Sequence, residues 1–121
     1  MKAARVLVVD DDALVGSLLG EMLAGMGHAV CAIETNEGDA ITAATRFHPD
    51  LMIVDERLGD GSGMRAVDAI LAAGPVPHVF VSGDISEIRL CRPHAEALQK
   101  PFRVAELERA IARVLAHPPG V

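Results

Sequence analysis

Residues 51–63 read Leu-Met-Ile-Val-Asp-Glu-Arg-Leu-Gly-Asp-Gly-Ser-Gly, and the rest of the chain can be placed around them. The first four residues are apolar, Ile53 and Val54 are β-branched, and the run stops abruptly at Asp55. A short apolar run ahead of a glycine-rich turn is typical of a strand buried on both faces of a parallel sheet. Chemistry in open α/β sheets gathers where such strands end, so Asp55 is a candidate reactive carboxylate, although aspartate also starts ordinary turns.

Strand-like and helix-like segments alternate five times along the chain. Strands are predicted at residues 5–9, 28–33, 51–55, 79–81 and 97–99, and helices at 13–26, 37–47, 62–73, 85–91 and 104–116. Asp12 and Asn36 are predicted caps of the first two helices. The alternation predicts an α/β fold, a flavodoxin-like doubly wound five-stranded parallel sheet in the order 2-1-3-4-5 with helices on both faces. We expect one domain over residues 1–121, an ordered core over about 4–116 and a fraying tail at Pro118–Gly120.

The spacing of apolar residues indicates which helix faces are buried. Leu14, Leu18 and Met22 recur at helical spacing in the first predicted helix, so we expect them in the core. Val104, Leu107 and Ile111 do the same in the last helix. Both helices are therefore predicted to be amphipathic.

The composition excludes two kinds of surface. Eleven basic residues against seventeen acidic ones give a formal net charge of −6, which argues against a nucleic-acid partner. The apolar run Val6–Val9 is too short for a signal peptide or a membrane span, so we expect a cytoplasmic protein without a membrane partner. The two cysteines, Cys31 and Cys91, and the five histidines show no metal-ligand spacing.

Polar side chains follow four of the predicted strands. Asp10 and Asp11 follow the first strand and Asp55 ends the third, and the predicted strand order brings these ends side by side. Two carboxylates about 4 Å apart repel by roughly 4 kcal/mol at an effective dielectric constant near 20, and a divalent cation such as Mg²⁺ relieves that repulsion. Ser82 and Lys100 end the fourth and fifth strands. Metal, carboxylate, hydroxyl and ammonium are the groups that phosphoryl transfer needs.

On these residues the sequence resembles the receiver domain of bacterial two-component response regulators over essentially its whole length. The matching segments are Val8-Val9-Asp10-Asp11, Val54-Asp55 with Gly63 eight residues on, Val81-Ser82-Gly83 and Lys100-Pro101-Phe102. The resemblance implies a phosphoprotein switch that accepts a phosphoryl group on Asp55 from a sensor histidine kinase or a phosphotransfer protein. It also implies Mg²⁺ (or Mn²⁺) held by Asp10, Asp11, Asp55 and the backbone carbonyl of Arg57, with Ser82 and Lys100 on the phosphoryl oxygens and a cis Lys100–Pro101 bond.

The resemblance further implies how the switch is used. Since the sequence stops at its fifth helix, we expect a single-domain switch that signals by contact with an unknown downstream protein or acts as a phosphate sink. It would be a monomer or weak dimer and no enzyme beyond its own phosphorylation and dephosphorylation. Ala13, Val15 and Ser17 are predicted to be exposed on the first helix, which docks the kinase in the family.

The sequence departs from the family at the switch itself. Ala97 lies where the family usually places a Tyr, Phe or His that swings inward, so we hypothesise that ordering of Gly83–Arg92 reports phosphorylation instead. The segment Pro77–Gly83 resembles a variant of the Pro-Phe-x-Phe-Ala-Thr-Gly-Tyr signature of some stand-alone proteobacterial receivers. Arg57 and Asp84 are each two residues beyond a site residue, and two interpretations stay open: they pair across the site mouth and impede water, or they are two solvated charges.

Two other functions compete with the switch. Asp10-Asp11-Asp12 also fits the Asp-x-Asp motif of haloacid-dehalogenase-type phosphatases, in which the first aspartate is the nucleophile. That family needs a further acidic pair after a later strand, where this chain has Ser82-Gly83-Asp84. The other alternative is a receiver that works as a phosphorylation-independent adaptor, against which the complete set of site residues argues.

Overall fold

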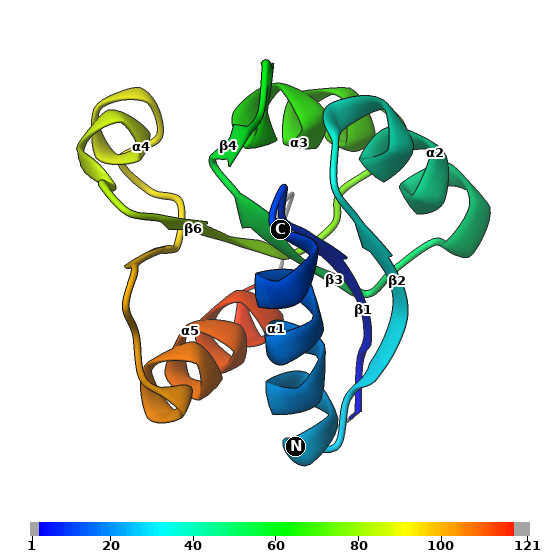
Figure 1. The fold of residues 1–121 in the computed structure, drawn as a ribbon, viewed down its shortest axis with the longest axis vertical. Coiled ribbons are helices and arrows are strands. Elements are labelled where there is room, and N and C mark those ends of the chain that lie inside the picture. The colour runs from blue at the N-terminus through cyan, green and yellow to red at the C-terminus, as the bar shows by residue number, and fades with distance from the viewer. Residues whose placement is uncertain (1–2, 118–121) are drawn as a thin grey trace.

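The computed structural model describes residues 3–117, which form a five-stranded parallel sheet with helices on both faces (Figure 1). The strands of this sheet are β1 (Arg5–Val9), β2 (Ala29–Glu34), β3 (Leu51–Asp55), β6 (His78–Ser82) and β7 (Ala97–Gln99), in the order β2-β1-β3-β6-β7. The helices are α1 (Ala13–Gly25), α2 (Glu37–Phe47), α3 (Gly63–Leu71), α4 (Ser86–Cys91) and α5 (Val104–Ala116). Because β6 and β7 are the fourth and fifth strands of the sheet, the predicted flavodoxin-like order 2-1-3-4-5 is confirmed. The tail Pro118–Gly120 lies outside the described residues.

Two short strands that the sequence did not indicate follow β3. β4 (Arg57–Leu58) and β5 (Gly61–Ser62) pair antiparallel and form a small hairpin. Gly59 lies between them with φ +63°, in the left-handed region that glycine reaches without a steric penalty. The hairpin places Arg57 beside the end of β3.

Each face of the sheet buries its own layer of side chains. β3 is buried along its whole length, and its residues alternate between the two layers. Met52 and Val54 pack with side chains of α2 and α3, whereas Leu51 and Ile53 pack with side chains of α1 and α5. Figure 1 shows α1 and α5 together on one side of the sheet and α2 and α3 on the other. Because both faces are covered, the central strand reads as an unbroken apolar run.

The predicted core face of α1 was wrong. Leu14 is 70% exposed and Leu18 is 52% exposed, whereas Gly16, Leu19 and Leu23 are buried. Met22, the third predicted position, is partly buried and packs against the core. Val15 also packs there, so of the three residues predicted to be exposed only Ala13 and Ser17 are exposed.

The reason for this error lies in a close approach of α1 to the sheet. A Cβ built on Gly16 would lie 2.9 Å from Cγ2 of Ile33 on β2, closer than real Cβ contacts come. The buried face is therefore centred on a glycine, which hydrophobic spacing does not detect. The predicted cap is confirmed, since the Asp12 side chain accepts hydrogen bonds from the backbone N–H groups of Leu14 and Val15.

The other helices follow the predicted pattern with one exception. Asn36 caps α2 by accepting from the Asp39 N–H, and Ser62 caps α3 by accepting from the Arg65 N–H. In α5, Leu107 and Ile111 are fully buried as predicted, but Val104 is 46% exposed. Val104 is the first residue of its helix.

Candidate functional site

Three carboxylates meet where β1 and β3 end. Val9 pairs with Val54 across the two parallel strands, so the residues that follow, Asp10 and Asp55, lie side by side. One oxygen atom from each of Asp10, Asp11 and Asp55 lies within 4.8 Å of the others. Asp10 is fully buried, Asp55 is 8% exposed and Asp11 is exposed. The predicted acidic cluster is therefore present, and its oxygen atoms are of the kind that hard divalent cations bind.

The Lys100 ammonium bridges two of these carboxylates. Its Nζ lies 3.2 Å from Oδ2 of Asp10 and 3.1 Å from Oδ2 of Asp55. The backbone positions it, because the Lys100 N–H donates to the Ser82 carbonyl at the end of β6. The Lys100–Pro101 bond is cis, as the resemblance implied. One ammonium against three carboxylates leaves an excess of negative charge, which fits a divalent cation beside them.

Burial and neighbouring charges act in opposite directions on the pKa values of Asp55 and Lys100. Burial raises the pKa of Asp55 above its ordinary value, and the neighbouring Lys100 only partly offsets this. Burial alone would lower the pKa of Lys100, but the hydrogen bonds and charges of Asp55 and Asp10 outweigh it, so the pKa of Lys100 is raised. Lys100 is therefore held as a cation beside a carboxylate that is poorly solvated.

Ser82 lies at the same edge, but its hydroxyl group is bound elsewhere. Its Oγ lies 2.7 Å from Oε1 of Glu56, with Glu56 only 5% exposed, and 2.9 Å from the Asp84 carbonyl. The sequence reasoning missed Glu56. A charged residue that directly continues a strand buried on both faces needs a polar partner, and this was the signal that could have identified it.

Arg57 and Asp84 flank the site without contacting each other. Within residues 3–117 the ion pair that the first interpretation placed between them is not formed. The Asp84 carboxylate instead accepts from the Ser86 N–H at 2.9 Å, at the start of α4. Hydrogen bonds from Ser86 lower the pKa of Asp84, and the charge of Arg57 contributes a smaller share.

These residues line a hollow of about 360 Å³ at the carboxyl edge of the sheet. Its walls are Asp11, Asp55, Arg57, Ser82, Gly83, Asp84 and Lys100. Every predicted side-chain site residue except Asp10 reaches this hollow, and Asp10 lies buried behind it with its Oδ2 on Lys100. The arrangement places carboxylates, an ammonium and a hydroxyl group around one space.

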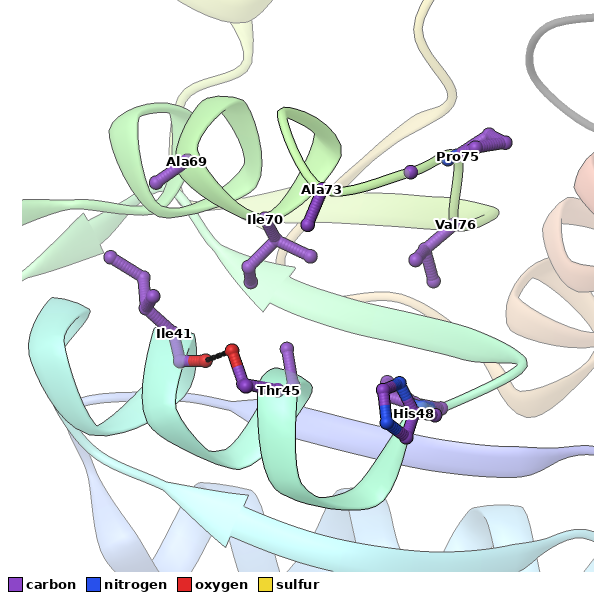
Figure 2. A pocket seen from close by; sticks show the side chains of 11 residues that line it. Ile41, Thr45, His48, Ala69, Ile70, Ala73, Pro75 and Val76 are labelled. Atoms are coloured by element: carbon purple, nitrogen blue, oxygen red, sulfur yellow. Dashed lines mark hydrogen bonds between the residues drawn. The ribbon is translucent and has the colours of Figure 1, made fainter.

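A second hollow, of about 330 Å³, lies between α2 and α3 (Figure 2). Its walls are largely aliphatic and include Ile41, Ala69, Ile70 and Val76, with Thr45 and His48 as polar members. The Thr45 hydroxyl donates to the Ile41 carbonyl of its own helix, at 3.1 Å. The second hollow has no acidic cluster and no ion pair among its described residues, so the chemistry lies at the carboxyl edge.

The lengths and the apolar character of the helices bear on whether any of them could span a membrane. No helix within residues 3–117 combines the length and the apolar character that spanning a bilayer requires.

Comparison with known proteins gives one consistent family. The sequence profile described as "Response regulator receiver domain" matches residues 6–112. The chain is 34% identical over 108 residues to the KDP operon transcriptional regulatory protein KdpE of Escherichia coli, covering 86% of this chain and 48% of KdpE. It is 24% identical over 115 residues to the chemotaxis protein CheY of Thermotoga maritima, covering 91% of this chain and 96% of CheY.

Other matches are to parts of longer proteins. The chain is 31% identical to the protein-glutamate methylesterase/protein-glutamine glutaminase 4 of Geobacter metallireducens and covers 31% of its length. It therefore spans less than half of two of the three curated relatives named here.

Solved structures give the same result. The receiver domain of the response regulator PhyR from Erythrobacter litoralis superimposes with a TM-score of 0.87 at 26% identity, over 100% of this chain and 96% of that one. A PhyR stress response regulator superimposes with a TM-score of 0.82 at 31% identity, over 98% of this chain and 47% of that one.

Proposed function

The chain belongs to the family of response regulator receiver domains, and from this premise we propose that Asp55 accepts a phosphoryl group from a sensor histidine kinase or a phosphotransfer protein. The observation that carries the proposal is the placement of the Lys100 ammonium, 3.1 Å from Asp55 and 3.2 Å from Asp10, beside a third carboxylate. A carboxylate, a fixed cation and an acidic cluster around one hollow are the groups that phosphoryl transfer to an aspartate needs.

The acidic cluster fits Mg²⁺ (or Mn²⁺). Asp10, Asp11 and Asp55 would supply carboxylate oxygens, and the backbone carbonyl of Arg57, on the hairpin next to Asp55, would complete the protein ligands. When bound, the ion would neutralise charge on the carboxylates and on the incoming phosphoryl oxygens. Asp10 would approach the ion from the buried side of the site. Its carboxylate is held in place there, since its Oδ1 also accepts from the Asp12 N–H at 2.9 Å.

The transfer step uses the carboxylate of Asp55 as the nucleophile. One of its oxygen atoms forms a bond to phosphorus while the bond from phosphorus to the imidazole nitrogen of a phosphohistidine breaks. The nitrogen leaves with the bonding pair, and Asp55 becomes an acyl phosphate. Lys100 then stabilises the transferred oxygen atoms electrostatically, because its ammonium already lies beside Asp55.

The donor would dock on the exposed side of α1. Leu14 and Leu18 are large apolar side chains, 70% and 52% exposed, on the helix that begins directly after the acidic cluster. Exposed apolar groups beside a reactive site are typical of protein contact surfaces. We place the resulting signal in protein–protein contacts of one cytoplasmic domain, a monomer or weak dimer, with no catalysis beyond its own phosphorylation and dephosphorylation.

The geometry disfavours the phosphatase alternative. In that mechanism Asp10 would be the nucleophile, but Asp10 is fully buried and does not line the hollow. Asp55, by contrast, lines the open hollow.

Incubation with acetyl phosphate and Mg²⁺, read by intact mass, tests the proposal. The wild type is expected to gain one phosphoryl group, and Asp55→Asn to gain none because an amide oxygen is a far weaker nucleophile. Asp60→Asn is the matched control, since Asp60 is an exposed acidic residue of the same loop outside the cluster. Mg²⁺-dependent labelling of Asp55→Asn at the wild-type level would overturn the assignment.

A further inference from the structure

The inference concerns Glu56, the residue that follows the proposed phosphoacceptor. Glu56 is 5% exposed, and its backbone is fixed on both sides: its N–H donates to the Val81 carbonyl and its carbonyl accepts from the Gly63 N–H. Its carboxylate accepts the Ser82 hydroxyl at 2.7 Å. A buried carboxylate needs a donor, and this hydroxyl is the side-chain donor that the structure gives it.

The Ser82 hydroxyl has one proton and two acceptors in its present position. They are Oε1 of Glu56 at 2.7 Å and the backbone carbonyl of Asp84 at 2.9 Å. A hydroxyl that is to donate to a phosphoryl oxygen must leave both. The bond to Glu56 has the short length of a charge-assisted hydrogen bond, so it is the stronger competitor.

The same oxygen atom is linked to the start of α4. Oγ of Ser82 accepts from the Asp84 N–H at 3.1 Å, and the Asp84 carboxylate accepts from the Ser86 N–H at 2.9 Å. α4 spans only six residues, of which Ile88 is buried, and its N-cap residue Ile85 provides no side-chain hydrogen bond. A movement of Ser82 would therefore remove a contact from the least anchored helix of the described chain.

We propose that Glu56 is a positioning residue that holds the Ser82 hydroxyl away from Asp55, so that phosphorylation must break the Glu56–Ser82 bond. Release of this bond would loosen the start of α4, which is the opposite of the ordering of Gly83–Arg92 hypothesised from the sequence. This inference rests on the proposed function, and it adds the Glu56 carboxylate as a competitor of the phosphoryl group for the Ser82 hydroxyl. It gives the chain a route from the site to α4 that needs no aromatic side chain, and Ala97 on β7 provides none.

We call the Glu56–Ser82 hydrogen bond the latch, and it makes a quantitative prediction about the binding of a phosphoryl mimic. Wild type, Glu56→Ala and the near-isosteric Glu56→Gln are titrated with beryllium at fixed fluoride and Mg²⁺. Because a hydrogen bond to a charged group opposes binding in the wild type, Glu56→Ala is expected to bind beryllofluoride roughly tenfold more tightly. Glu56→Gln keeps an acceptor without the charge and is expected to fall between the two. Glu87→Gln, which removes one exposed charge from α4, is expected to match the wild type.

A double-mutant cycle with Ser82→Ala separates the latch from simple charge repulsion. In the Ser82→Ala background, Glu56→Ala is expected to leave the titration midpoint unchanged, because there is no hydroxyl to release. An equal gain in both backgrounds, or no gain with Ser82 present, would overturn the latch while leaving the phosphoacceptor assignment intact. A wild type without any Mg²⁺-dependent response would overturn the proposed function itself, and the latch with it.

A spectroscopic measurement gives a readout that a purely structural role would not change. NMR couplings between the α and β protons of Ser82 report its χ1 rotamer. One rotamer is expected in the free wild type, a second with beryllofluoride, and an average of both in free Glu56→Gln. A single unchanged rotamer of Ser82 in all three samples would contradict the proposal.

Discussion

The two hollows of this molecule have nearly the same volume and opposite chemistry. The hollow at the carboxyl ends of the strands, about 360 Å³, is lined by charged groups at or just beyond the ends of four strands of the sheet, β1, β3, β6 and β7. The hollow between α2 and α3, about 330 Å³, has mostly aliphatic walls and lies where the chain enters β3 and β6. The difference shows that the direction of the strands, more than the size of a cavity, determines where a parallel sheet carries reactive groups.

The two ends also differ in what their residues contribute. At the carboxyl end, buried Asp10 and Asp55 are held together by Lys100 at a cost in desolvation, which is typical of a site that serves function. At the amino end, aliphatic side chains such as Ile70 pack between helices and stabilise the fold. Side-chain truncations at the carboxyl end should therefore affect mainly reactivity and those at the amino end mainly stability, whereas a displaced backbone should cost stability at either end.

The largest expected effect comes from the tightest packing at the carboxyl end. A Cβ on Gly63 would lie 2.0 Å from the Asp55 carbonyl oxygen, so Gly63→Ala must displace the backbone that carries Asp55. We expect a loss of about 3 kcal/mol or more in unfolding free energy, measured by urea denaturation. Gly25→Ala is the control, because a Cβ there meets nothing within 4 Å. A Gly63→Ala protein as stable as that control would show that the backbone beside Asp55 yields to the added Cβ without cost.

A truncation at the amino end should separate stability from reactivity. Ile70 is 7% exposed and lines the α2–α3 hollow, so Ile70→Ala is expected to cost about 2–3 kcal/mol of unfolding free energy. The extent of labelling by acetyl phosphate at low temperature should stay at the wild-type level. Leu90→Ala, at a residue 84% exposed, should change stability by less than about 0.5 kcal/mol. Reduced labelling of folded Ile70→Ala would mean that the two ends are coupled.

The cation should stabilise the carboxyl end alone. At a Mg²⁺ concentration ten times its Kd, binding to the folded state raises the unfolding free energy by about 1.4 kcal/mol. Asp11→Asn should remove this gain and be more stable than the wild type in the presence of a chelator, since it relieves repulsion in the acidic cluster. Thermal unfolding with and without Mg²⁺ measures both. An undiminished gain in Asp11→Asn would exclude Asp11 as a ligand.

The smallest expected effect is a pH dependence at the amino end. Burial lowers the pKa of His78 below its ordinary value of 6.5, and its Nδ1 lies 2.9 Å from the Val76 carbonyl. The unfolded chain takes up the His78 proton at higher pH than the folded one. The contribution of neutral His78 to the unfolding free energy is therefore fully present above about pH 6.5. It is lost as the pH falls from there toward the folded pKa.

Replacement of the ring tests this contribution. Between about pH 7 and pH 6 the wild type should lose up to about 0.7 kcal/mol more unfolding free energy than His78→Phe. The phenyl ring keeps the aromatic contact with Phe80, whose ring centre lies 5.2 Å from that of His78. Parallel pH profiles of the two proteins would assign the titration to other groups.

The parts of the fold that depend on local chemistry were predictable. The run that becomes β3 is apolar at every position because both of its faces are covered, and that composition is visible in the sequence. Asp12 and Asn36 were recognisable as caps because their side-chain oxygens satisfy backbone donors of their own helices. The convergence of Asp10, Asp11 and Asp55 followed from strand order alone.

The parts that depend on tertiary contacts were not predictable. The buried face of α1 is set by contact between Gly16 and Ile33, residues from two elements, and glycine gives no hydrophobic signal. The hairpin of β4 and β5 comprises two residue pairs, too few for a recognisable pattern. The partner of Glu56 lies 26 residues away on another strand, so its role required the coordinates.

The Lys100–Asp10 ion pair has a consequence for the synthesis of the protein on the ribosome. Its two residues are separated by 90 positions, so the ribosome finishes the acidic segment long before it adds the counter-charge. At about 5–20 residues per second, the nascent chain carries its aspartates without Lys100 for roughly 5–18 seconds. The ion pair therefore cannot form until synthesis has passed β7.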